Sequence, residues 1–150
     1  MKDRKLRTET ILNGNLLQVF EFFSKAENLN LLTPSHLNFK ITTPSPIIMK
    51  RGTLIDYRLV LYGIPFKWRT EISEFNAPNT FTDTQLKGPY TKWIHKHSFS
   101  EIDGKVLMID EVTYRSPGWI FEPLIHSLFV KRNLEQIFAF RDQACKKLFV

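Results

Sequence analysis

The chain has 150 residues, of which 43% are hydrophobic and 13% aromatic, and this composition excludes a disordered protein. The length predicts a single domain over residues 1–150. The one cysteine, Cys145, excludes an intramolecular disulfide framework and a cysteine-based zinc finger. The formal net charge is +6 at pH 7, but the basic residues are dispersed along the chain. No nucleic-acid partner is therefore expected, because single-strand binders interleave basic and aromatic residues.

The first ten residues, MKDRKLRTET, are charged and polar, and no apolar run of a signal peptide follows them. No stretch approaches the ~18 apolar residues that predict a transmembrane helix. Together with the lone thiol, these features predict a cytoplasmic protein without a membrane span.

The first elements are short. Residues 7–12 form a predicted strand that ends at Asn13-Gly14-Asn15. Apolar residues at helical spacing predict a short helix over 16–23, with Asn15 as its N-cap. A second short helix is predicted over 26–32, because Pro34 disfavours helix at the residue before it. Residues 37–42 alternate as a strand.

The middle of the chain alternates strands and turns. Five strands are predicted, separated by turn sequences such as Asp103-Gly104, over residues 53–61, 66–75, 80–86, 90–99 and 106–114. Strands joined by tight turns are antiparallel. Residues 119–150 are helical, with an apolar face that changes phase near Phe129, so that the longer helix begins near residue 128. The expected fold class is α+β, with six to seven antiparallel strands curved around a long C-terminal helix.

Strand alternation predicts which side chains face that helix. In 90–99, Lys92 and Lys96 mark the solvent face, so Trp93, His95 and His97 point inward. The same reasoning sends a further set of side chains inward, namely Tyr57, Leu59, Trp68, Thr70, Met108, Asp110 and Tyr114. In 80–86 the alternation does not decide between the two faces, and we favour Phe81, Asp83 and Gln85 as the inward set. On the helix, Arg141 shares a stripe with Ile137.

Polar side chains on an otherwise apolar inner face indicate a chamber for a small molecule, since unpaired buried polar groups cost about 1–3 kcal/mol each. Alternatives remain for these groups. Arg141 is a candidate for pairing with Asp110 or Asp83 instead of a ligand, and His95 and His97 for linking strand to helix. A metal site of both histidines plus Asp110 is a weak hypothesis, so no metal and no cofactor are predicted.

Several motifs support the same fold: Val19-Phe20-Glu21-Phe22-Phe23-Ser24, Leu32-Thr33-Pro34, Gly52-Thr53-Leu54-Ile55-Asp56-Tyr57, Gly88-Pro89-Tyr90, Trp93-x-His95-x-His97-x-Phe99, Asp110-x-Val112-x-Tyr114 and Leu134-x-x-Ile137-Phe138-x-x-Arg141. Together with the order of elements, they resemble the helix-grip fold of the START-like, or SRPBCC, superfamily, in particular its bacterial ligand-binding subfamily. The resemblance covers nearly the whole chain. It implies a deep cavity for a hydrophobic ligand and supports the inward placement of Phe81, Asp83, Gln85 and Asp110. Some relatives look fused to a nucleotide-sugar-epimerase-like domain, which this chain lacks.

The resemblance supplies no reaction, because a fold does not fix a function. The first hypothesis is a non-catalytic binder of a hydrophobic or amphipathic molecule (a lipid, isoprenoid or polyketide-like compound). The second is a cyclase or dehydratase with His95 or His97 as general base, positioned by Asp110 or Asp83, and Tyr57 or Tyr114 as proton donor. The third is an interaction protein that binds an RNA-containing or protein partner through its basic surface.

Overall fold

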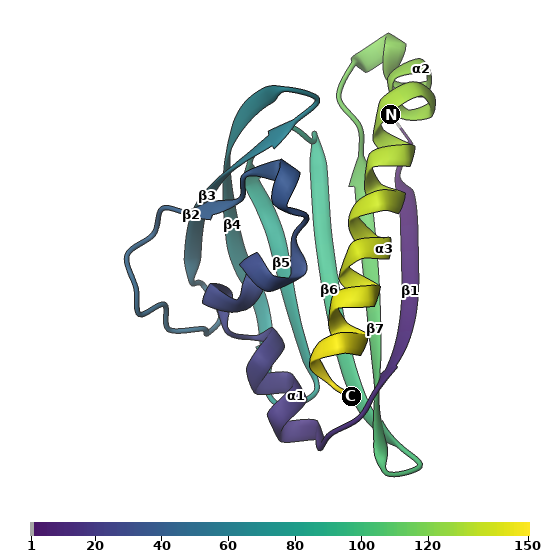
Figure 1. The fold of residues 1–150 in the computed structure, drawn as a ribbon. Coiled ribbons are helices and arrows are strands. Elements are labelled where there is room, and N and C mark those ends of the chain that lie inside the picture. The colour runs from purple at the N-terminus through teal and green to yellow at the C-terminus, as the bar shows by residue number, and fades with distance from the viewer. Residues whose placement is uncertain (1) are drawn as a thin grey trace.

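A computed structural model describes residues 2–150, which form one curved antiparallel sheet and a long C-terminal helix (Figure 1). The sheet has seven strands in the order β1-β7-β6-β5-β4-β3-β2. Their bounds are β1 (Arg4–Leu12), β2 (Lys40–Ile41), β3 (Leu54–Leu61), β4 (Ile64–Asn76), β5 (Thr80–Lys87), β6 (Lys92–Ile102) and β7 (Lys105–Arg115). The predicted fold class is confirmed.

The first and the last strand of the chain, β1 and β7, are neighbours in the sheet. Strands β3 to β7 follow one another through hairpins, whereas β1 pairs with β7 along its whole length, from Arg4 opposite Tyr114 to Leu12 opposite Val106. Strand β2 is shorter than the strand predicted over 37–42. The first residue of the predicted strand, Leu37, is instead the end of a 3-10 turn, η2 (Ser35–Leu37). The next residue, Asn38, lies in the left-handed region with φ 49°.

Two helical segments after β1 lie where the sequence predicts them. Helix α1 (Leu16–Phe23) is capped by the Asn15 side chain, which accepts a hydrogen bond from the Gln18 amide at 2.8 Å. The second segment, η1 (Ala26–Leu32), is a 3-10 helix, not an α-helix. It ends where the Thr33 hydroxyl donates to the Leu29 carbonyl at 2.7 Å, just before Pro34.

The C-terminal helical region contains the predicted change of phase. A 3-10 turn, η3 (Trp119–Phe121), and a short helix, α2 (Glu122–Ile125), lead into a π-helical turn, η4 (His126–Val130), and then helix α3 (Lys131–Leu148). A π turn holds an extra residue, which rotates the side chains that follow it around the helix axis. This turn contains Phe129 and explains why the apolar face moves there.

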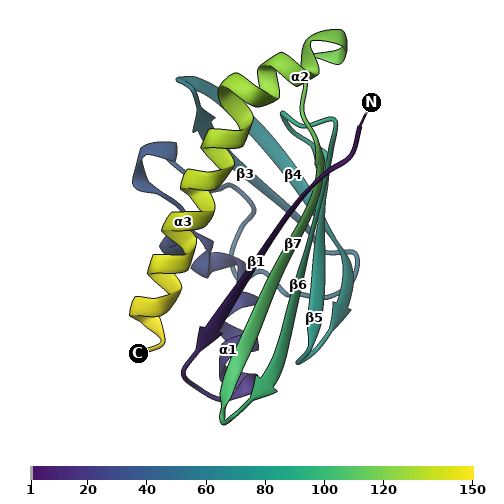
Figure 2. The same ribbon diagram turned by 90° about the vertical axis from the view of Figure 1, so that its right-hand side faces the viewer.

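Helix α3 crosses the concave side of the sheet, with α1 beside its C-terminal end (Figure 2). At that end, α1 and β7 share a core of aromatic and aliphatic side chains that includes Phe20, Phe99, Met108 and Cys145. At the other end, Leu134 and Phe138 of α3 belong to a second core cluster, which contains Trp93 of the sheet. In the described part of the chain, no helix is both long and apolar enough to cross a membrane.

Candidate functional site: a cavity between the sheet and α3

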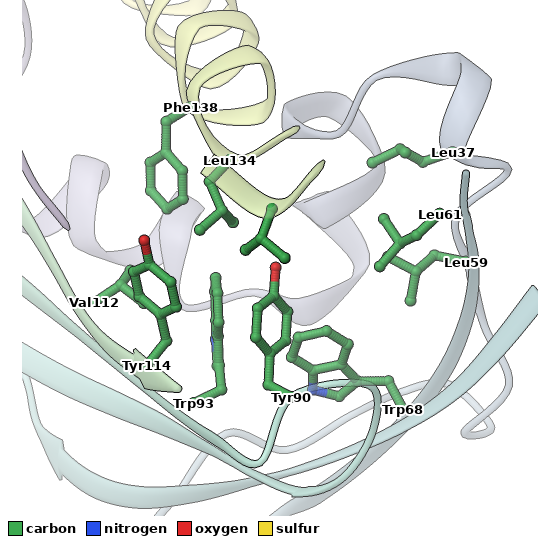
Figure 3. Packing of buried hydrophobic residues seen from close by; sticks show 11 residues of the cluster. Leu37, Leu59, Leu61, Trp68, Tyr90, Trp93, Val112, Tyr114, Leu134 and Phe138 are labelled. Atoms are coloured by element: carbon green, nitrogen blue, oxygen red, sulfur yellow. The ribbon is translucent and has the colours of Figure 1, made fainter. Parts of the chain in front are cut away.

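A cavity of about 170 Å³ lies between the sheet and the middle of α3. Figure 3 shows part of its wall: Trp93 on β6 and Tyr90 in the turn before it point toward α3, whose Leu134 and Phe138 project toward the sheet. The Trp68 ring lies beside Tyr90. The exposed surface of the wall is mostly apolar, so a ligand here would gain from burial of hydrocarbon at roughly 25 cal/mol per Å².

Eleven of the fifteen residues predicted for the inner face line this cavity. They come from five elements, β3 to β6 and α3, so alternation on separate strands brings distant residues together. These residues are Tyr57, Leu59, Trp68, Thr70, Phe81, Asp83, Trp93, His95, His97, Ile137 and Arg141. Whether they contact a ligand stays a prediction.

Four of the predicted residues face inward but do not line the cavity, because their side chains bond to or pack against neighbouring groups. The Gln85 amide donates to the Tyr90 carbonyl at 2.7 Å and accepts from its amide at 3.2 Å, which closes the turn between β5 and β6. Met108 lies in the core under α1, and the Tyr114 hydroxyl lies 2.8 Å from His126 Nε2. Asp110 is enclosed by polar side chains described below.

The sequence reasoning did not single out the lining that comes from outside the strands. Phe23, Leu29 and Leu37 contribute from the segment α1 to η2, and Phe39 and Met49 from the irregular chain around β2. Phe23 belongs to the helical spacing that predicts α1, and Leu37 and Phe39 belong to the alternation over 37–42, but no periodic pattern marks the other two positions. On α3, helical spacing does contain a signal for Asn133, which lies four residues before Ile137 and is also part of the wall.

A cluster of five polar side chains forms one part of the wall and the layer behind it. His95 Nε2 lies 2.8 Å from Asp110 Oδ1, and His97 Nε2 lies 2.7 Å from Asp83 Oδ2. Asp110 Oδ1 also lies 3.1 Å from His97 Nδ1. Arg141 Nε and Nη2 each donate to one oxygen of Asp110 at 3.2 Å. Strands β6 and β7 and helix α3 therefore meet at Asp110, and Asp83 of β5 joins the cluster through His97.

Burial and pairing act in opposite directions on these groups. Burial alone would raise the pKa of Asp110, but the Arg141 charge and the bonds from His95 and His97 hold that pKa well below its ordinary value. Asp83 behaves similarly: burial opposes ionisation, while His97 lowers its pKa. Both acids are therefore carboxylates that only accept hydrogen bonds.

The two histidines differ although their rings stack with centroids 3.7 Å apart. Burial and the neighbouring His97 lower the pKa of His95 despite its bond to Asp110. Burial also acts against a charge on His97, but its contacts with Asp110 and Asp83 raise its pKa. Arg141 Nη2 lies 3.4 Å from His97 Nδ1, which is farther than Asp110 Oδ1. His97 is therefore the histidine that holds a second proton more readily.

One group of potential metal ligands occurs among residues 2–150. Asp83, His95 and His97 each place one ligand atom within 4.8 Å of the others. The sequence pointed to Asp110 as the third ligand, but Asp110 binds the opposite nitrogen of His95 and would support the histidines from behind.

A buried donor in the wall has no partner. The Trp68 Nε1–H group is inaccessible and forms no hydrogen bond within residues 2–150, although Trp68 lines the cavity. An unpaired buried donor costs about 1–3 kcal/mol.

The sequence matches no protein-family model, and a search of curated proteins finds no match. Solved structures are similar in shape. Ginseng major latex-like protein 151 from Panax ginseng has a TM-score of 0.71 at 11% identity, covering 99% of this chain and 98% of that one. TTHA0849 from Thermus thermophilus has a TM-score of 0.72 at 15% identity, covering 95% and 97%.

A third similar structure is the nucleoside-diphosphate sugar epimerase from Corynebacterium glutamicum, with a TM-score of 0.65 at 22% identity. The match covers 95% of this chain but 28% of that protein. At these identities the likeness concerns the fold. The seven-stranded sheet that curves around α3 is a helix-grip fold, as predicted.

Proposed function

We propose that this protein binds a hydrophobic or amphipathic small molecule, of lipid, isoprenoid or polyketide-like character, between the sheet and α3 without transforming it. The observation that carries the proposal is the cavity itself, whose wall is apolar apart from a polar cluster. Pockets for small molecules combine apolar walls with a few convergent polar groups.

The proposal is tested by binding and by filling the cavity. Native mass spectrometry of freshly purified protein should find a co-purified apolar compound, and a neutral dye such as Nile red should bind the protein. Ala26 is buried and lines the cavity, so Ala26→Leu should weaken dye binding by about tenfold or more. Ala139, on the exposed side of α3, provides the matched control, and Ala139→Leu should bind as the wild type does.

Two results would contradict this function. One is a folded wild-type protein that binds neither the dye nor a co-purified compound. The other is dye binding that Ala26→Leu leaves unchanged while circular dichroism shows a native fold, because the dye would then occupy another surface.

One arrangement favours an enzyme as a second candidate. His95 Nε2 is bound to the Asp110 carboxylate, and the lowered pKa keeps the ring neutral, which is the state of a general base positioned by an acid. Tyr57 lines the cavity and is a possible proton donor, whereas Tyr114 is bonded to His126 instead. If the co-purified compound changes mass on incubation with the wild type but not with His95→Ala, the protein is an enzyme.

A further inference from the structure

The polar part of the cavity wall contains an unpaired acceptor on His95. Asp110 is a carboxylate and accepts the hydrogen bond from His95 Nε2 at 2.8 Å, so the ring proton resides on Nε2. The other nitrogen, Nδ1, then carries a lone pair. Within the described chain Nδ1 forms no hydrogen bond, and the residue is only 8% exposed.

Asp83 provides a second acceptor beside it. The two residues are paired across β5 and β6, and Asp83 Oδ2 lies 3.9 Å from His95 Nδ1. Asp83 Oδ2 accepts from His97 Nε2, while Oδ1 has no hydrogen-bond partner among residues 2–150. Because both atoms only accept, they cannot satisfy each other, and a donor between them is required.

The nearby positive charges are already paired. His97, whose pKa is raised, directs its two ring nitrogens at Asp83 and Asp110. Arg141 directs Nε and Nη2 at Asp110, with which it forms a buried ion pair. An anionic group placed here would find one guanidinium nitrogen, Nη1, but also the Asp83 charge. Like charges in a buried site cost far more than on the surface, since little water screens them.

We propose that this polar end selects ligands whose polar group donates hydrogen bonds, a hydroxyl or an amine, and disfavours a carboxylate or phosphate. The inference rests on the proposed function and names the chemistry of its ligand. A hydroxyl would donate its one proton to His95 Nδ1 or to Asp83, and an amine would donate to both, while the rest of the molecule lies against the aromatic wall.

The same atoms are potential ligands of a metal ion, but their geometry favours a hydrogen-bond donor over a metal. Around a metal with bonds of about 2.0–2.2 Å, ligand atoms lie roughly 3.3 Å apart in a tetrahedral site. His97 Nε2 and Asp83 Oδ2 are 2.7 Å apart, which is a direct hydrogen bond. A metal would have to break this bond and remove the proton that it contains.

The test uses compounds that share one skeleton. Chelator-treated protein is loaded with Nile red, which is displaced by 2-naphthol, 2-naphthylmethylamine, 2-methoxynaphthalene or 2-naphthoate at pH 7. We expect 2-naphthol or the amine to bind about tenfold or more tightly than both the methyl ether, which lacks the donor, and the carboxylate. The ranking of 2-naphthol against the amine separates a hydroxyl ligand from a cationic one.

Two variants locate the effect. Asp83→Asn replaces the carboxylate with an amide that can also donate, so the preference for 2-naphthol over 2-naphthoate should fall by about tenfold. Asp56→Asn is the control, because Asp56 is paired with Arg69 on the outer face of the sheet and the preference should remain. If Asp83→Asn does not fold, His95→Leu serves the same purpose, since it removes the other acceptor.

The outcomes separate the two proposals. Equal or tighter binding of 2-naphthoate, or an unchanged preference in the folded Asp83→Asn protein, overturns donor selection but leaves ligand binding intact. Stoichiometric binding of added zinc that blocks 2-naphthol also overturns it, in favour of a metal site. If Nile red and all four compounds fail to bind, the proposed function fails as well.

Discussion

The Asp110 carboxylate and the Arg141 guanidinium form a two-point ion pair in the interior, with Nε and Nη2 each 3.2 Å from a different oxygen. Asp110 is 2% exposed and Arg141 is 8% exposed. The pair connects β7 with α3, whereas the rest of the contact between sheet and helix is mostly apolar and non-directional. The pair therefore fixes the position of α3 over the cavity.

Removing one partner of this pair should destabilise the protein strongly. Arg141→Leu would leave Asp110 as a buried charge without its main counter-ion, and breaking buried pairs in this way costs about 3–5 kcal/mol. The free energy of unfolding, measured by urea denaturation at pH 7, should fall by that amount. The Arg141→Leu/Asp110→Leu double variant should recover part of the loss, because it removes both charges.

The control for this measurement is an exposed pair on the same helix. Lys146 lies 2.9 Å from Asp142 with its side chain largely in solvent, and Lys146→Ala should cost about 0.5 kcal/mol or less. A small loss in Arg141→Leu, comparable with that control, would show that Arg141 serves the ligand and not Asp110.

The strand faces could be predicted because alternation is local and charged residues identify the solvent side. Lys92 and Lys96 lie between inward-pointing neighbours, and Trp93, His95 and His97 are buried as expected. The same rule cannot say how far the cavity extends along the sheet. That depends on where α1 and the end of α3 meet the strands, which is why Met108 lies in packed core.

The sequence also could not predict which of its polar residues pair with one another. Whether Arg141 would contact a ligand, Asp83 or Asp110 depends on how β5, β7 and α3 lie relative to one another, and in the structure it contacts Asp110. Similarly, the amphipathic pattern of residues 119–129 does not reveal that Trp119, Leu124 and Leu128 remain exposed. A periodic apolar stripe predicts a helix face but not what covers it.

The pair between Arg4 and Glu122 connects β1 with α2 and should be sensitive to pH. Arg4 Nε and Nη2 donate to the two carboxylate oxygens at 2.8 and 3.1 Å. The bond from Arg4 lowers the pKa of Glu122 although burial opposes this. Because folding lowers this pKa, the stabilisation is present above the ordinary value for glutamate and is lost as pH falls through the folded-state value.

Arg4→Ala should therefore lower the free energy of unfolding by about 1.5–3 kcal/mol at pH 7, the range for hydrogen bonds to charged groups. The difference from the wild type should shrink as pH falls through the lowered pKa of Glu122, which urea denaturation across a pH series would measure. Lys5→Ala, at the exposed neighbouring position of β1, should have little effect. A pH-independent difference would mean that Arg4 acts through packing of its side chain alone.

The Tyr114 hydroxyl and His126 Nε2 anchor the π-helical turn to β7 at 2.8 Å. Tyr114→Phe would leave the buried His126 nitrogen without its partner, so the free energy of unfolding should fall by about 1–3 kcal/mol. In Tyr114→Phe, hydrogen exchange should accelerate relative to the wild type, and it should accelerate more at the amides of residues 126–130 than at those of α3. Tyr90→Phe is the comparison, because this buried tyrosine bonds to Gln85 through its backbone and should keep the turn intact. Unchanged exchange in the turn of Tyr114→Phe would contradict the anchoring role.

Cys145 should be inert in the native protein. Its side chain is fully buried in the core, and burial raises the pKa of its thiol to about 11 despite the nearby Arg141. The thiolate is the reactive form, so at pH 8 little of it is present and the core blocks access by reagents. Reaction with a thiol reagent such as DTNB should be slow in buffer and complete within minutes in denaturant.

Arg141→Leu should accelerate labelling if loss of the ion pair opens the core around α3. Rapid labelling of the native wild type would contradict both the burial of Cys145 and the close packing of α1 against α3 around it.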